Sequence, residues 1–311
     1  MSDALHSRQR TLAKSCQIRG RGYWSGEQVC ATVHPAGTNH GITFTRTDLH
    51  SSEASQTPAT PATVEYRDEA ALRTNLKVSN GRVEMIEHLM SALVGLGICN
   101  ADVRVDRTEL PALDGSSIGY ANRLQAAGIV EQNAPPVALA LKEPFRIGDG
   151  DAWVEVHPSS RGETIYEYQL DYGRESDIPP CKFTYELSHR SYVSEVAPAR
   201  TFVTLSQADL IRSQGLASHV TNEDLLVIGP HGPIENRYRF PNECARHKTL
   251  DLIGDLALSG VFLIAHVVSH RGGHALNGAV AQRIRDLAIE SGLISQRPYV
   301  LSQESKFRRA A

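Results

Sequence analysis

The segment 244–256 restricts most strongly how this chain can fold. Its apolar residues recur at helical spacing, which predicts a helix. On that helix His247 and Asp251 lie one above the other, and Asp255 continues the same face one turn further on. An imidazole nitrogen and a carboxylate oxygen at this spacing can both reach one divalent metal ion. Since two ligands do not complete a catalytic zinc site, the fold must bring a third ligand from elsewhere.

A second segment with helical periodicity, residues 83–98, carries the candidate third ligand. Its glycines suit a helix C-cap, and Glu87 and His88 lie near its start. His88 together with His247 and Asp251 would give two imidazoles and one carboxylate, a catalytic zinc set with a fourth position open to water. Glu87 could then take a proton from that water. Alternatively, His88 fills a helix interface and Glu87 is solvated.

His274 lies in the glycine-rich stretch 271–278, which predicts a loop with little side-chain bulk around it. A histidine there can serve as a general acid, and Asp255 is available to hold it. Alternatively, His274 is a surface residue in a turn. Lys248 could bind a phosphate through its positive charge; alternatively, it is an ordinary exposed lysine of a helix.

The division of the chain follows from its length and its prolines. A chain of 311 residues suggests two domains, and the two prolines in residues 133–136 favour a boundary there. We predict an α+β fold of two similar domains, 1–132 and 137–311, each a sheet packed against helices with the active site between them. A weak repeat supports this, because His88 and His247 are each followed by a glycine seven residues later.

The remaining elements follow from local patterns. Strands are expected at 28–33, 41–46, 101–105, 137–141, 152–157, 164–172, 225–229, 236–240 and 261–268, and 64–78 is expected to form a strand and a short polar link. Helices are expected at 118–127, 206–212 and 278–291, a loop at 51–63, and no clear element at 179–198. Three tyrosines of the 164–172 strand either stack on a ligand ring or form the inner face of the second domain.

Composition excludes several classes of function. The net charge of −3 gives no reason to expect nucleic acid as a partner. Five scattered cysteines without a CxxC pair fit reduced thiols, which predicts a cytoplasmic protein. Residues 1–14 lack the apolar core of a signal peptide, and no stretch is apolar and long enough for a membrane span.

Five segments together resemble a known family. They are 87–97 (EHLMSALVGLG), 110–117 (LPALDGSS), 199–202 (ARTF), 246–256 (RHKTLDLIGDL) and 273–277 (GHALN). In this order they are similar to the UDP-3-O-acyl-N-acetylglucosamine deacetylases of lipid A biosynthesis (LpxC), and the likeness runs from about residue 10 to residue 286. The joint pattern is specific, although no single motif would be.

The resemblance implies residue roles beyond those the residues alone suggest. It implies one catalytic Zn²⁺, or Fe²⁺, held by His88, His247 and Asp251, with Glu87 as general base. His274 would be the protonated partner, oriented by Asp255. Thr201 would donate to the oxyanion, Phe202 would line the sugar or acyl site, and Lys248 would meet the diphosphate of a UDP-linked acylated glucosamine.

Two departures from the family pattern stand out. Trp24 occupies the position of a histidine in the family's Gly-Leu-His-[Ser/Thr]-Gly, and His219-Val220 replace an expected pair of glycines. The second departure predicts a narrower acyl passage and a changed chain preference, unless both side chains point away from it.

The sequence therefore predicts a monomeric zinc amidohydrolase that removes acetate from the UDP-sugar. Two alternatives stay open: a zinc deacetylase diverged to another acylated sugar, and a non-catalytic paralogue.

Overall fold

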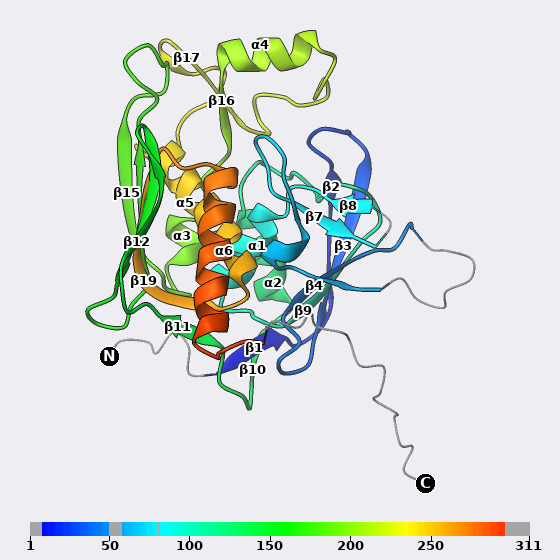
Figure 1. The fold of residues 1–311 in the computed structure, drawn as a ribbon. Helices are drawn as coiled ribbons and strands as arrows, with labels where there is room; N and C mark the ends of the chain where they lie inside the picture. Colours follow the sequence, from blue (N-terminus) through cyan, green and yellow to red (C-terminus); the bar gives the residue numbers. More distant parts are fainter. Residues whose placement is uncertain (1–7, 50–57, 80, 296–311) are drawn as a thin grey trace.

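The computed structural model describes residues 8–49, 58–79 and 81–295. Two β-sheets lie on opposite sides of the molecule, with the principal helices between them (Figure 1). The loop expected at 51–63 and the N-terminal stretch 1–14 fall partly outside the described residues. Within the described ranges, no helix is long and apolar enough to cross a membrane. The mixed arrangement of sheets and helices confirms the expected α+β class.

The first sheet belongs to the N-terminal half. Its strands, in spatial order, are β2 (Cys16–Arg21), β3 (Gln28–Pro35), β9 (Ala101–Val105), β4 (Ile42–Arg46) and β5 (Thr60–Pro61). β3 runs antiparallel to both neighbours, whereas β4 is parallel to β9. Alternate residues of β3 are buried, as expected for a strand with one face on the core. This sheet therefore turns a single apolar face toward the helices.

The second sheet repeats this topology in the C-terminal half. Its strands, in spatial order, are β12 (Phe145–Asp149), β13 (Ala152–Pro158), β19 (Phe262–His270), β14 (Ile165–Leu170) and β15 (Cys181–Glu186), with β11 (Ala138–Ala140) also paired to β19. β13 is antiparallel to both neighbours, and β14 is parallel to β19. In each half, the strand that comes last in the sequence lies at the centre of the sheet, β9 in the first sheet and β19 in the second. The two halves are therefore similar units, as the sequence predicted.

Helices from both halves fill the space between the sheets (Figure 1). They are α1 (Glu87–Gly95), α2 (Ile118–Ala126), α5 (Glu243–Leu256) and α6 (His274–Glu290), with the short α3 (Tyr192–Glu195), η1 (Val64–Tyr66) and η2 (Ala257–Ser259) around them. α1 and α5 pack directly on each other. Their apolar residues belong to one core cluster that spans both halves. Burial of each large side chain there contributes about 1.5–3 kcal/mol.

Smaller sheets complete the architecture. They are β1 (Gln9–Leu12) with β10 (Ile129–Gln132), β6 (Arg67–Asp68) with β7 (Asn75–Val78) and β8 (Gly81–Val83), and β16 (Phe202–Thr204) with β17 (Leu226–Gly229) and β18 (Gly232–Pro233). Helix α4 (Leu205–Ser213) covers the last of these and begins with a capping box. Because β10 ends and β11 begins on either side of residues 133–136, we retain the domain division there as a proposal.

Gly254 allows the close crossing of α1 and α5. A Cβ at this position would lie 2.1 Å from the carbonyl oxygen of Glu87 and 2.9 Å from its carbonyl carbon. These are backbone atoms and cannot rotate away. The glycine that follows His247 by seven residues therefore has a packing reason in three dimensions. The corresponding Gly95 of α1 lies against the ring of Tyr192.

The variant Gly254→Ala is expected to be destabilised. Alanine gains about 1 kcal/mol of helix propensity over glycine, but forced overpacking costs about 1–3 kcal/mol, and here the obstacle is backbone. The melting temperature should therefore fall. Gly37→Ala serves as the control, because a Cβ at Gly37 meets open space. An unchanged melting temperature for Gly254→Ala would contradict the described crossing.

Three segments differ from the expectation. The segment 64–78, predicted as a strand and a short polar link, is a 3-10 turn and two short strands joined by a loop. The strand predicted at 236–240 is absent from this described stretch, because the side chain of Asn236 and the carbonyl of Arg237 bind Arg200 instead of a neighbouring strand. The stretch 179–198 contains β15 and α3, which were missed although Phe183 and Tyr185 alternate with polar residues.

Candidate metal and hydrolytic site

The three expected ligands come together at the crossing of α1 and α5. The ligand atoms of His88, His247 and Asp251 all lie within 4.8 Å of one another, and all three residues are buried. His247 Nε2 is 3.3 Å and His88 Nε2 is 3.8 Å from Asp251 Oδ1. The two imidazole rings meet edge to face with centroids 5.1 Å apart. Only the tertiary fold brings His88 to the other two, because it lies in the opposite half of the chain.

The chemistry of this donor set fits a divalent cation. Asp251 Oδ1 is buried and has no hydrogen-bond partner among the described residues, which is costly unless a ligand satisfies it. His247 Nδ1 lies 3.1 Å from the carbonyl of Ala199 and donates to it, so Nε2 keeps its lone pair facing Asp251. Metal-binding histidines commonly have such a carbonyl partner. The site thus has an uncompensated oxygen and an oriented nitrogen directed at the same point.

The expected protonation states also suit a metal. Burial, together with repulsion from His247, lowers the pKa of His88 to about 3, and burial lowers the pKa of His247 as well. Burial alone would raise the pKa of Asp251, but its electrostatic interactions with the neighbouring His247 and with the cations Lys248 and His274 lower it. Neutral imidazoles and an ionised carboxylate are the forms that bind metal ions.

Glu87, the first residue of α1, lines the cavity beside this donor set. Its Oε2 accepts the backbone N–H of Thr74 at 3.0 Å, which fixes the carboxyl group. Burial raises the pKa of Glu87 to about 7, against the opposing effect of His274. A carboxyl group with this pKa can both take up and release a proton near neutrality.

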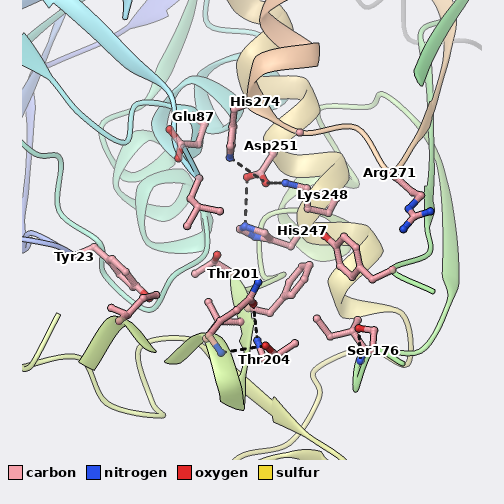
Figure 2. A pocket seen from close by; sticks show the side chains of 18 of the residues that line it. Tyr23, Glu87, Ser176, Thr201, Thr204, His247, Lys248, Asp251, Arg271 and His274 are labelled. Carbon is pink, nitrogen blue, oxygen red and sulfur yellow. Dashed lines mark hydrogen bonds and ion pairs between the residues drawn. The ribbon is translucent and has the colours of Figure 1, made fainter. Parts of the chain in front are cut away.

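His274 occupies a different structural context from the one predicted. It is the first residue of helix α6 rather than part of a loop, because the carbonyl of Gly273 accepts the first helical hydrogen bond, from Asn277. Its side chain is only 10% exposed, whereas the glycine-rich sequence suggested an open position. Figure 2 shows His274 and Glu87 beside Asp251.

Asp255 holds His274, as the sequence suggested. Asp255 Oδ2 accepts from His274 Nδ1 at 2.9 Å and from Asn277, and Oδ1 accepts from the hydroxyl of Thr74 at 2.6 Å. Nε2 of His274 is thereby turned toward Asp251, 3.9 Å from Oδ2. Burial opposes the charge on His274, but Asp255 and then Asp251 outweigh it and raise its pKa to about 9. His274 is therefore a cation at neutral pH.

Thr74 links Glu87 to Asp255, because its backbone N–H donates to Glu87 and its hydroxyl donates to Asp255. Sequence reasoning missed Thr74 because a single threonine in a loop carries no signal.

We expect Thr74→Val to lose stability, since Asp255 loses a donor whose removal costs about 1–3 kcal/mol. Turnover should fall as well, because His274 loses part of its support. Thermal unfolding and kcat measure the two effects, and Thr74→Ser, which keeps the hydroxyl, is the control. Equal behaviour of the valine and serine variants would contradict this role.

Thr201 and Phe202 approach the site from the start of β16. Thr201 lines the cavity, and its backbone N–H is used on the carbonyl of Gly115. Phe202 stands edge-on to His247 with ring centroids 6.1 Å apart, and Tyr172 lies beside it at 6.4 Å. Tyr172 is outside strand β14 and lines the cavity, whereas Tyr166 and Tyr168 belong to the core. The three tyrosines therefore do not share one role.

A cavity of about 890 Å³ opens from the candidate metal site. Besides His274, it is lined by the cations Lys248 and Arg271. Lys248 donates to Asp251 Oδ2 at 2.7 Å, and this contact raises its pKa although burial opposes the charge. Arg271 has a left-handed φ of 54°, and no ion pair of its guanidinium occurs in the described ranges. Strained residues of this kind cluster at ligand-binding positions. Arg271 was missed, although it directly precedes the glycine pair before His274.

The two departures from the family pattern meet in one place. His219 Nε2 lies 2.9 Å from the carbonyl oxygen of Gly22, in the loop that carries Trp24. Val220 packs with Tyr23 in a separate apolar cluster, and neither His219 nor Val220 lines the cavity. Trp24 does line it, stacked beneath the guanidinium of Arg73 at 5.0 Å. His219 therefore contacts the loop that carries Trp24 and does not itself line the cavity.

Comparison with known proteins gives one consistent result. Residues 9–286 match the family model described as UDP-3-O-acyl N-acetylglycosamine deacetylase (LpxC). The chain is 39% identical over 276 residues to the UDP-3-O-acyl-N-acetylglucosamine deacetylase of Thermosynechococcus vestitus, covering 89% of this chain and 93% of that protein. Proteins of the same name from Neisseria meningitidis and Myxococcus xanthus are each 35% identical, over 89% of this chain and 89% and 86% of theirs.

Proposed function

The chain belongs to the UDP-3-O-acyl-N-acetylglucosamine deacetylase family, and from that membership we propose that it hydrolyses the N-acetyl group of a UDP-linked, 3-O-acylated N-acetylglucosamine in lipid A biosynthesis. The products would be acetate and UDP-3-O-acyl-glucosamine. One observation carries the proposal most strongly: Asp251 Oδ1, which has no hydrogen-bond partner in the described part of the chain, faces two histidines beside a separately held acid/base pair.

His88, His247 and Asp251 would hold one Zn²⁺, or Fe²⁺, in this proposal. A bound divalent ion supplies Lewis-acid polarisation and lowers the pKa of water. The orphaned carboxylate oxygen and the neutral imidazoles support binding of such an ion. Asp251 Oδ2 is already engaged by Lys248, which leaves Oδ1 for the cation.

Glu87 would act as the general base. Its Oε2 is held by the N–H of Thr74, so the carboxylate is fixed toward the cavity. It takes a proton from the attacking water as the new C–O bond forms. The hydroxyl of Thr201 would donate to the oxygen of the acetamide carbonyl, where negative charge develops.

His274 would act as the general acid. Held at Nδ1 by Asp255, it presents Nε2 to the site and is protonated at neutral pH. It stabilises the developing negative charge and then gives its proton to the leaving amine nitrogen as the C–N bond breaks. Positioning by Asp255 and Thr74 means that little rearrangement is needed during the reaction.

The cavity supports a substrate that is both anionic and apolar. Lys248 and Arg271 offer positive charge for a diphosphate, with Arg271 free of ion pairs in the described ranges. Phe202 and the exposed Leu210 of α4 offer apolar surface for a sugar face or an acyl chain. We further propose that the protein acts as a monomer in the cytoplasm and without nucleic acid.

The test is a product assay on the purified, zinc-loaded chain with UDP-3-O-acyl-N-acetylglucosamine. We expect acetate and a free amine to appear in equal amounts. Turnover of other acylated amino sugars alone would instead favour a deacetylase diverged to a different substrate. Tight zinc binding without acetate release from any of these sugars would favour a non-catalytic paralogue.

A further inference from the structure

A buried ion pair joins the segment before β16 to the first turn of α5. Arg200 is 4% exposed and Glu243 is completely buried. Arg200 donates to Glu243 Oε1 from Nε at 2.8 Å and from its backbone N–H at 3.1 Å, and to Oε2 from Nη2 at 3.2 Å. Asn236 and the carbonyl of Arg237 accept its remaining bonds at 2.9 and 2.7 Å. Each nitrogen of this guanidinium therefore donates at least one hydrogen bond.

The neighbours of Arg200 on both sides belong to the candidate site. The carbonyl of Ala199 accepts the hydrogen bond of His247 Nδ1, and Thr201 lines the cavity. Glu243 lies one helical turn before His247 on the same helix. The ion pair thus holds residues 199–201 against α5, next to the predicted metal ligand His247.

We propose that Arg200 and Glu243 are positioning residues for His247. By holding residue 199 in place, the pair keeps the Ala199 carbonyl on Nδ1, which fixes the tautomer and directs Nε2 toward Asp251. A hydrogen-bonded carbonyl behind a metal-binding histidine typically changes metal affinity about 10–100-fold. The inference rests on the proposed metal site, but the tautomer of His247 can be observed without metal or substrate.

Glu243→Gln and Arg200→Lys test the proposal. We expect the zinc dissociation constant, measured by chelator competition at a temperature where the protein is folded, to rise roughly 10–100-fold. In the metal-free protein, ¹⁵N NMR of the His247 ring should show loss of the single Nδ1–H tautomer. Arg46→Lys is the matched control, because Arg46 forms a largely buried ion pair with Asp48 and also binds the carbonyl of Arg82. The control should change thermal stability alone.

A purely structural role predicts a different result. The two test variants would then melt at lower temperature yet retain wild-type zinc affinity and the wild-type tautomer, and this outcome would overturn the proposal. If either single variant does not fold, Arg200→Met/Glu243→Leu removes both buried charges together, which proteins tolerate better than loss of one partner. A folded double variant with an unchanged tautomer would equally overturn it. If the wild-type chain bound no zinc, the proposed function would fail, whereas the tautomer comparison would still decide this inference.

Discussion

His247→Ala is expected to lose bound metal and turnover together while the chain stays folded. The ring of His247 supplies one of three donors, and the two that remain, His88 and Asp251, do not complete a catalytic zinc site. Since changes behind a ligand already cost about 10–100-fold in affinity, loss of a ligand itself should exceed about 100-fold. Metal analysis after gel filtration and an acetate-release assay measure the two effects.

His231→Ala is the control for that variant, because His231 is exposed and does not line the cavity. It should retain metal and activity. Far-UV circular dichroism should show both variants folded. A His247→Ala protein with wild-type metal content and turnover would remove the basis of the proposed site.

Glu87→Gln and His274→Ala are each expected to lose roughly 10²–10⁴-fold in kcat, the usual contribution of a general base or acid. Glutamine keeps an oxygen to accept the Thr74 N–H but cannot take a proton from water. Alanine at position 274 removes the proton donor and leaves Asp255 without its cation. Neither residue belongs to the donor set, so zinc content should be retained.

Glu155→Gln and His157→Ala are matched controls, since these residues form a Glu–His contact of 3.1 Å on strand β13. Both should turn over substrate like the parent protein. Loss of zinc in the Glu87 or His274 variants would mean that these residues act as ligands rather than as base and acid. Turnover near that of the parent would mean that the assigned role is wrong.

The helical spacing of residues 244–256 predicted much of the geometry of the candidate site. A period of 3.6 residues puts His247, Asp251 and Asp255 on one face, and the structure has them there. The two similar α+β halves were also predicted, although from weak evidence. Local periodicity succeeded here because the ligand pair and its helix lie within one short segment.

Other features depend on contacts between distant segments and could not be predicted from local patterns. The hydrogen bond from Thr74 to Asp255 joins residues 181 positions apart in the sequence, and the one from Arg200 to Glu243 joins residues 43 positions apart. The helix containing His274 begins earlier than predicted, because Gly273 acts as N-cap without a side chain that would reveal it. Thr74 acts through its hydroxyl and Gly273 through its backbone, and such groups leave no pattern in a sequence, whereas the charged pair of Arg200 and Glu243 is too far apart in the chain for a local pattern to link it.

In the proposed site, the crossing of α1 and α5 would give a bound metal ion a second, thermodynamic role. One half of the chain contributes His88 and the other His247 and Asp251, so neither half alone offers the full donor set. Ion occupancy and the docking of the two halves are then linked equilibria. An ion at 100 times its dissociation constant would favour the docked arrangement by about 2.7 kcal/mol. Metal starvation would therefore loosen the junction between the halves as well as halt catalysis.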